Sequence, residues 1–143
     1  MHPEVVIAAR GWIGTPYLHQ ASVRGVGCDC LGLLRGVWRE VFGQEPETVP
    51  TYTPDWSEPQ GEERLFDAAL RHMRQVPTAE MAPGQVLLFR MRAGAVAKHI
   101  GIVSATGVQP RFIHAYAGHG VVESPLSAPW QRRIAACFAF SKG

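Results

Sequence analysis

The eight residues from Gly27 to Leu34 constrain this chain most, because they join an irregular segment to a helical pattern. Apolar residues then recur at i, i+3, i+4 and i+7, the spacing of an amphipathic helix. These residues are Leu33, Leu34, Val37, Trp38, Val41 and Phe42. Gly43 follows and marks the helix end, and Asp29 suits the N-cap position. The pattern predicts a helix from Cys30 to Phe42, with its apolar face in a core and its first turn at a cleft.

Cys30 is a candidate nucleophile because of its place in the first helical turn. Unpaired N–H groups and the positive end of the helix dipole favour an anion there. Both lower the pKa of a thiol, and the thiolate is the reactive form. A buried cysteine that acts only as a small apolar side chain is the alternative, and this segment alone favours it. The assignment therefore depends on residues further along the chain.

The bulk properties of the sequence narrow the class of protein. At 143 residues the chain is long enough for one domain with its own core, so we expect a single domain over residues 1–143. A net charge of +2 with both signs interspersed gives no case for a nucleic-acid partner. No apolar run has the length of a membrane span, and residues 1–20 lack the pattern of a secretory signal. Three cysteines do not suit a disulfide framework, so we expect synthesis in the cytoplasm with reduced thiols.

The rest of the chain predicts helices first and strands afterwards. Two further helices are expected from Pro3 to Trp12 and from Glu62 to Arg74. After Pro77 the period becomes two, which predicts strands at Val86 to Met91, Lys98 to Ser104, Arg111 to Tyr116, Val121 to Ser124 and Ile134 to Phe140. Loops are expected at His19 to Gly27, in the proline-rich Gln44 to Gly61, and at Pro125 to Trp130. This order predicts an α+β fold with an antiparallel sheet of about five strands.

Two consecutive predicted strands each carry one histidine, His99 and His114. Neighbouring strands can present both rings on one face of the sheet, because side chains alternate between faces. A thiol nucleophile needs an imidazole within hydrogen-bond reach and a third polar group that holds that ring in the right tautomer. Each histidine alone is more readily structural. Together with Cys30, the two histidines form a candidate catalytic set.

A zinc site is the rival interpretation of the same residues. Cys28, Cys30, His99 and His114 supply two thiols and two imidazoles, a ligand set that suits tetrahedral zinc. Their spacing differs from the compact ligand pairs of structural zinc sites. We therefore expect no metal, no organic cofactor and no essential role for Cys28. Cys137 lies in an apolar run and is expected in the core.

Five short motifs follow one another along the chain. They are Gly14-Thr15-Pro16-Tyr17, Gly27-Cys28-Asp29-Cys30-Leu31-Gly32-Leu33, Pro83-Gly84-Gln85-Val86-Leu87-Leu88-Phe89, His99-Ile100-Gly101-Ile102-Val103 and Phe112-Ile113-His114-Ala115. In this order and spacing they resemble the NlpC-type cell-wall cysteine peptidases over nearly the whole chain. The resemblance implies a papain-like fold in which N-terminal helices pack on the sheet. The chain is most similar to the phage-tail branch of the family, which includes the peptidase encoded with gene transfer agents.

The resemblance also implies a function for particular residues. Cys30 is implied as the nucleophile, His99 as the base and His114 as the residue that orients it. Tyr17 is implied as part of the oxyanion site, and we place Asp29 with it as an oxyanion or substrate-binding residue. The implied substrates are peptide bonds of murein stem peptides, commonly between D-glutamate and diaminopimelate. The chain departs from many members at Leu31, where they have serine, and at Cys28.

A murein hydrolase acts outside the cytoplasmic membrane. The resemblance to phage-tail enzymes implies that a phage-like particle carries this protein to the target envelope, with tail-tip or baseplate proteins as partners. Candidate attachment points are the segment with Tyr52 and Trp56 and the Pro125 to Trp130 loop. Two alternatives stay open: an amidase or acyltransferase that uses the same triad, and a tail-tip structural protein with a vestigial site.

Overall fold

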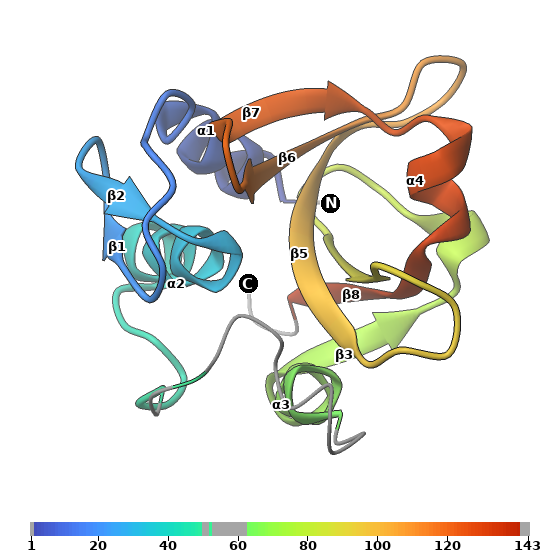
Figure 1. Ribbon diagram of the computed structural model, residues 1–143, viewed down its shortest axis with the longest axis horizontal. Coiled ribbons are helices and arrows are strands. Elements are labelled where there is room, and N and C mark those ends of the chain that lie inside the picture. The colour runs from blue at the N-terminus through green and yellow to red at the C-terminus, as the bar shows by residue number, and fades with distance from the viewer. Residues whose placement is uncertain (1, 50–51, 53–62, 141–143) are drawn as a thin grey trace.

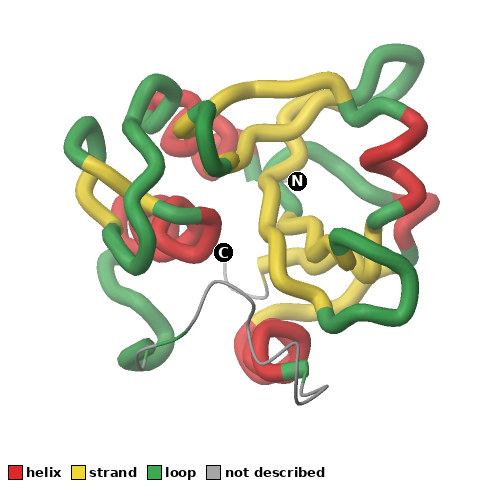
Figure 2. The backbone as a smooth tube through the Cα atoms, in the orientation of Figure 1, coloured by secondary structure: helices red, strands yellow, loops and turns green. Residues whose placement is uncertain are grey.

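The computed structural model describes residues 2–49, 52 and 63–140. In this α+β fold, helices pack on a sheet whose neighbouring strands are all antiparallel (Figure 1; Figure 2). The elements are α1 (Pro3–Gly11), β1 (Ser22–Val23), β2 (Gly27–Cys28), α2 (Cys30–Phe42), α3 (Arg64–His72), β3 (Met73–Val76), η2 (Thr78–Glu80), β4 (Val86–Arg90), β5 (Ala97–Ala105), β6 (Arg111–Tyr116), β7 (Gly120–Pro125), α4 (Ala128–Arg132) and β8 (Ile134–Phe140). Within these described residues, no helix is long and apolar enough to cross a membrane.

The main sheet has the strand order β3-β8-β4-β5-β6-β7. Strands β4 to β7 pair consecutively, and the last strand, β8, returns to lie between β3 and β4. The pairing of β5 shifts register against β4 at Phe89/Arg90 and against β6 between Val103 and Ala105. Such irregularities bend a strand. Accordingly β5 is strongly curved and the sheet curls towards α4 (Figure 1).

Alternation along the strands divides the interior into two apolar clusters, one on each face of the sheet. One face packs against α1, α2 and α3 through Val86, Leu88, Ile100, Ile102 and Ile113. The other face contributes Leu87, Phe89, Val103, Phe112 and Cys137, which pack with Leu126 and Trp130. Figure 1 shows α1 and α2 on one side of β5 and α4 on the other. Cys137 is fully buried in this second cluster, as its apolar surroundings in the sequence predicted.

Helix α2 has the bounds that the sequence predicted, Cys30–Phe42. Its N-cap is Asp29, whose Oδ1 accepts the Gly32 N–H at 2.7 Å, and Gly43 follows with a φ of 92°. Gly36 allows the helix to pack closely, because a Cβ there would lie 2.0 Å from the ring of Trp12. The amphipathic pattern, the cap and this close approach together position the first turn of α2 against the sheet.

The fold class is confirmed, and several boundaries are corrected. The main sheet has six strands, because Met73–Val76 forms β3 on the edge of β8 instead of continuing the helix that was predicted as far as Arg74. All four of these residues pair with residues of β8, and this pairing outweighs their helical pattern. The predicted loop from His19 to Gly27 contains the β1–β2 hairpin. The loop predicted from Pro125 runs into α4 at Ala128.

Candidate active site

The first turn of α2 meets β5 at a cavity of about 130 Å³, which Cys30 and His99 both line. The Sγ of Cys30 lies 3.8 Å from the backbone oxygen of Lys98, the residue before His99. The other residues around the cavity are Tyr17, His19, Asp29, Tyr52, Met91, Lys98, Ala115, Tyr116 and Ala117. The structure therefore brings the thiol and the first histidine of the candidate set to one place, although 69 positions separate them in the sequence.

The two histidines are hydrogen-bonded to each other. The Nε2 of His99 lies 2.8 Å from the Nδ1 of His114, on the neighbouring strand β6. Both residues are buried, with exposed fractions of 7% and 1%. The Nδ1 of His99 is then the ring nitrogen that remains for chemistry in the cavity. The arrangement is that of a base whose ring is held by a second polar group.

Sequence reasoning missed two residues that complete this arrangement. The Oγ of Ser124, on β7, lies 3.0 Å from the Nε2 of His114. The indole of Trp130 lies against both imidazoles, with centroids 5.5 Å from His99 and 5.1 Å from His114. Strand alternation could have shown which face Ser124 occupies, but not which residue it meets. Trp130 reaches the histidines through α4, which the sequence did not predict.

Apolar rings surround the histidine pair. Phe112 stacks on His114 at 4.2 Å between centroids, and Phe89 lies 5.7 Å from His99. A Cβ at Gly101 would lie 2.6 Å from the Phe112 ring. The space left by Gly101 is therefore filled by Phe112, which packs on one of the histidines. These contacts exclude water from the His99–His114 hydrogen bond.

Burial determines the protonation states of the site. Burial and, to a smaller extent, the Asp29 carboxylate together raise the pKa of the Cys30 thiol to about 12, although backbone N–H groups act in the opposite direction. The sequence-based expectation of a depressed thiol pKa is therefore wrong. The helix terminus favours the thiolate, but the loss of hydration at a buried sulfur outweighs it.

Both histidines are neutral at pH 7. Burial, with a smaller contribution from His114, lowers the pKa of His99 to about 3. Burial likewise lowers the pKa of His114 to about 4, with a contribution from His119. The resting pair is thus a thiol and a neutral imidazole. Moving the proton from sulfur to nitrogen creates two opposite charges that stabilise each other, so burial opposes the pair less than either charge alone.

Tyr17 lies at the edge of the cavity with its hydroxyl protonated. Its backbone forms a bridge to Cys28, two residues before the nucleophile. Burial, with smaller contributions from Cys30, Asp29 and Cys28, raises the Tyr17 pKa to about 12. A protonated phenol is a hydrogen-bond donor. This placement suits an oxyanion site, and the role of Tyr17 stays a prediction.

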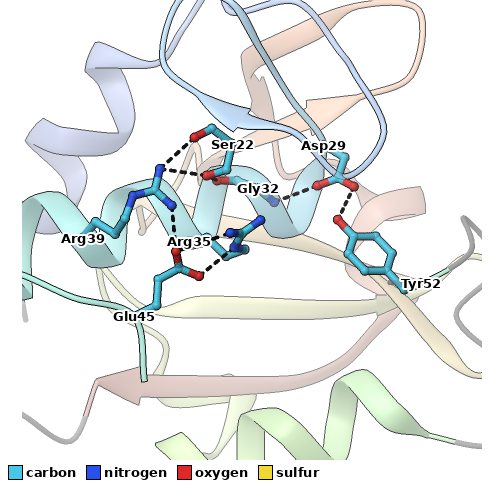
Figure 3. A network of polar contacts seen from close by, with 7 residues as sticks. All are labelled: Ser22, Asp29, Gly32, Arg35, Arg39, Glu45 and Tyr52. Carbon is cyan, nitrogen blue, oxygen red and sulfur yellow. Dashed lines mark hydrogen bonds and ion pairs between the residues drawn. The ribbon is translucent and has the colours of Figure 1, made fainter. Parts of the chain in front are cut away.

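Asp29 caps the N-terminus of α2. Its Oδ1 accepts the Gly32 N–H, and its Oδ2 accepts the Gln20 N–H at 2.7 Å and the hydroxyl of Tyr52. Figure 3 shows the carboxylate between Gly32 and Tyr52. A carboxylate offers acceptors and no donor to an oxyanion. The contacts give Asp29 a capping role, and its predicted role as an oxyanion or substrate-binding residue stays a prediction.

The segment that carries Tyr52 is joined to α2 by ion pairs. Glu45 accepts from Arg35 at 2.6 Å and from Arg39 at 2.9 Å, and Arg39 also donates to the backbone oxygen of Ser22 at 2.7 Å (Figure 3). The same helix thus supplies Cys30 at its first turn and cations further along. These contacts hold Glu45 and Ser22 against α2.

Comparisons with known proteins identify the family of this chain. A sequence model of the NlpC/P60 family matches residues 14–138, most of the chain. The chain belongs to the NlpC/P60 family. NlpC/P60 proteins are peptidoglycan hydrolases, a class of cell-wall peptidase, so the NlpC-type resemblance read from the five motifs is confirmed at the level of the family.

Curated relatives in the NlpC/P60 family come from Escherichia coli K12. The chain is 28% identical over 123 residues to "Murein DD-endopeptidase MepS/Murein LD-carboxypeptidase", which covers 85% of this chain and 54% of that protein. It is 27% identical over 126 residues to "Probable endopeptidase NlpC", covering 87% of this chain and 69% of that one. The chain thus spans about half the length of the first relative.

Solved structures of NlpC/P60 proteins share the fold. The NlpC/p60 domain of the peptidoglycan hydrolase SagA superposes with a TM-score of 0.64 at 20% identity, over 98% of this chain and all of that domain. An NlpC/P60 family protein from Bacillus cereus ATCC 10987 gives a TM-score of 0.69 at 18% identity, over 99% of this chain and 41% of that one. These likenesses confirm the α+β NlpC-type fold.

The departures from the usual NlpC/P60 pattern lie in the core. Cys28 is fully buried in β2 and packs in the cluster between helices and sheet. Leu31 lines a separate, largely apolar cavity of about 320 Å³, together with Leu34, Trp38 and Leu65. In the part of the chain that the structure describes, no three side chains of the metal-binding types gather closely enough to hold an ion. The zinc interpretation therefore lacks a ligand set there.

The buried histidines make stability depend on pH. Their folded-state pKa values lie below the unfolded value of about 6.5, so the unfolded chain binds more protons as pH falls from 6.5 towards 4. Near pH 5 each histidine should therefore lower the free energy of unfolding by about 1.4 kcal/mol for every unit by which the pH falls. His114→Gln should remove one such contribution, as urea denaturation between pH 7 and 5 can measure. An unchanged pH slope in the variant would contradict the burial of a neutral His114.

Proposed function

We propose that this protein is a cysteine endopeptidase that cleaves murein stem peptides, with Cys30 as nucleophile, His99 as base and His114 as the residue that orients the base. The observation that carries this proposal is the shared cavity of Cys30 and His99, combined with the 2.8 Å bond from His99 to His114. Membership of the NlpC/P60 family supports the substrate class, and so do the murein endopeptidase and endopeptidase names of the E. coli relatives.

The geometry supports general-base activation of a neutral thiol. His99 takes the Cys30 proton on Nδ1 as the sulfur attacks the scissile carbonyl carbon. In this proposal the backbone N–H of Cys30 and the hydroxyl of Tyr17 stabilise the oxyanion. The His99 imidazolium then protonates the leaving amine from Nδ1, which leaves an acyl-enzyme. Water, deprotonated by the same nitrogen, hydrolyses the thioester and restores the thiol.

The finer parts of the proposal rest on the sequence resemblance. They are cleavage between D-glutamate and diaminopimelate, synthesis in the cytoplasm, and transport to the target envelope on a phage-tail or gene-transfer-agent particle. The two candidate attachment segments carry Trp130, Trp56 and Tyr52. Trp130 packs on both histidines, so its substitution would disturb the site itself. Trp56 lies outside the described residues. Tyr52 bonds to Asp29 and lines the cavity, which ties it to the site as well.

Cys30→Ala should abolish hydrolysis of purified murein, because the sulfur is the attacking atom. Cys28→Ser is the matched control, since it alters the neighbouring thiol, which lies in the core, and it should keep most of the activity. Mass spectrometry of the released fragments measures both variants and identifies the bond cut. Wild-type turnover by Cys30→Ala would remove the nucleophile assignment. Fragments cut at an amide outside the stem peptide would favour the amidase alternative.

His99→Ala should lose nearly all activity, because it removes both the base and the acid of the cycle. His114→Gln should lose less, because the amide oxygen can still accept the Nε2–H of His99. The measurement is kcat and KM on a soluble stem-peptide fragment. If His114→Gln proved more severe than His99→Ala, the roles of the two histidines would be reversed.

Particle delivery predicts that Trp56→Ala reduces co-purification with phage-like particles more than it reduces activity on soluble fragments. The reason is chemical: aromatic residues at a protein surface commonly mark contacts with another protein. The comparison is the ratio of particle-bound enzyme to specific activity, in the variant and in the wild type. Tight binding of the free enzyme to intact walls, or incorporation into particles that lack the other tail-tip proteins, would show that delivery works differently.

A further inference from the structure

Ser124 stands at the end of a chain of hydrogen bonds that begins in the active-site cavity. His99 Nε2 lies 2.8 Å from His114 Nδ1, and His114 Nε2 lies 3.0 Å from Ser124 Oγ. The three residues come from consecutive strands, β5, β6 and β7. On β7, Ser124 pairs with Phe112, so its side chain shares the face of β6 that His114 occupies. The proposed mechanism uses the first bond and leaves the second without a role.

The hydrogens of this chain have two consistent arrangements. In one, His99 donates Nε2–H to His114 Nδ1, and His114 donates Nε2–H to the serine oxygen. In the other, the serine hydroxyl donates to His114 Nε2, and His114 donates Nδ1–H to His99. The second arrangement moves the proton of neutral His99 to Nδ1, the nitrogen that must accept the thiol proton. Only the first arrangement leaves His99 able to act as a base.

We propose that Ser124 is a positioning residue: its oxygen accepts the Nε2–H of His114 and thereby keeps Nδ1 of His99 free of a proton. This inference rests on the proposed function. Ser124 acts on the reaction only through two rings, because its hydroxyl contacts His114 and not the cavity. In the first arrangement every donor points away from the thiol, and the serine hydrogen is left to bond elsewhere.

The surroundings of His114 explain why an acceptor matters there. His114 is 1% exposed, and the rings packed around it are those of Phe112, Tyr116 and Trp130. A buried N–H without an acceptor costs more than a typical hydrogen bond contributes. Removing the Ser124 oxygen therefore favours the tautomer of His114 that keeps its proton on Nδ1. That tautomer donates to His99 and places the His99 proton on the wrong nitrogen.

The chain offers a matched control on the neighbouring strand. Ser104, on β5, is 7% exposed, and its hydroxyl donates to Glu123 Oε2 at 2.8 Å. Glu123 also accepts from Arg10. Ser104→Ala therefore removes a part-buried serine hydrogen bond of similar kind. Its acceptor, Glu123, precedes Ser124 on β7, and neither histidine takes part in the bond. A general loss of strand stability would affect the two alanine variants alike.

The experiment compares Ser124→Ala, Ser124→Thr and Ser104→Ala with the wild type. Ser124→Ala should lower kcat on a stem-peptide fragment by on the order of tenfold, as expected for one hydrogen bond, with KM unchanged. Ser124→Thr, which keeps the hydroxyl, should restore kcat, and Ser104→Ala should retain it. Nitrogen-15 NMR of labelled histidines at pH 7 should show His114 protonated at Nε2 in the wild type and at Nδ1 in Ser124→Ala.

The readouts separate this inference from the proposed function. The histidine tautomers are measured in the resting protein, so they test Ser124 even if the chain hydrolyses no murein. A wild type without activity would refute the proposed function alone. The proposed role of Ser124 is refuted if Ser124→Ala keeps both kcat and the wild-type His114 tautomer. It is also refuted if Ser104→Ala loses as much kcat as Ser124→Ala, or if wild-type His114 carries its proton on Nδ1.

Discussion

The rest of the site depends on the hydrogen bonds that the carboxylate of Asp29 accepts. Asp29 is 2% exposed, and its two carboxylate oxygens accept hydrogen bonds from Gly32, Gln20 and Tyr52. These donors belong to the helix, to the loop before it and to the segment after it. One side chain therefore fixes the start of α2 and, with it, the position of the Cys30 sulfur. The carboxylate also raises the thiol pKa, so the group that positions the nucleophile disfavours its charged form.

Burial has the same double effect on the histidines. The rings of Phe89, Phe112 and Trp130 hold His99 and His114 in a dry, well-packed place. Dry surroundings strengthen the bond between the two imidazoles, but they also oppose protonation of either ring. The resting site is thus uncharged at the reacting atoms. In the proposed mechanism, charge separation is favoured only when the sulfur and the imidazole exchange a proton together, which would couple deprotonation of the thiol to attack on the substrate.

The sequence predicted the parts of the fold that depend on local pattern. The bounds of α2, β6 and β8 agree with the structure, because an N-cap, a terminal glycine and strict alternation all act within a few residues. It failed where partners lie far apart along the chain. Met73–Val76 joined β8, and Ser124 and Trp130 reached the histidines across strands and a helix. The thiol pKa was mispredicted for a related reason, since burial is a property of the assembled core.

The two halves of the candidate site come from opposite sides of the sheet. Cys30 belongs to the cluster packed under α1, α2 and α3, whereas the aromatic residues around His99 and His114 belong to the cluster under α4. The bent strand β5 connects them, because the Lys98 carbonyl faces the sulfur while the adjacent His99 ring bonds to His114. Adjacent residues of a strand point to opposite faces. The His99 side chain, on the face of the histidine pair, nevertheless lines the cavity of Cys30, so the thiol and the imidazole meet at β5.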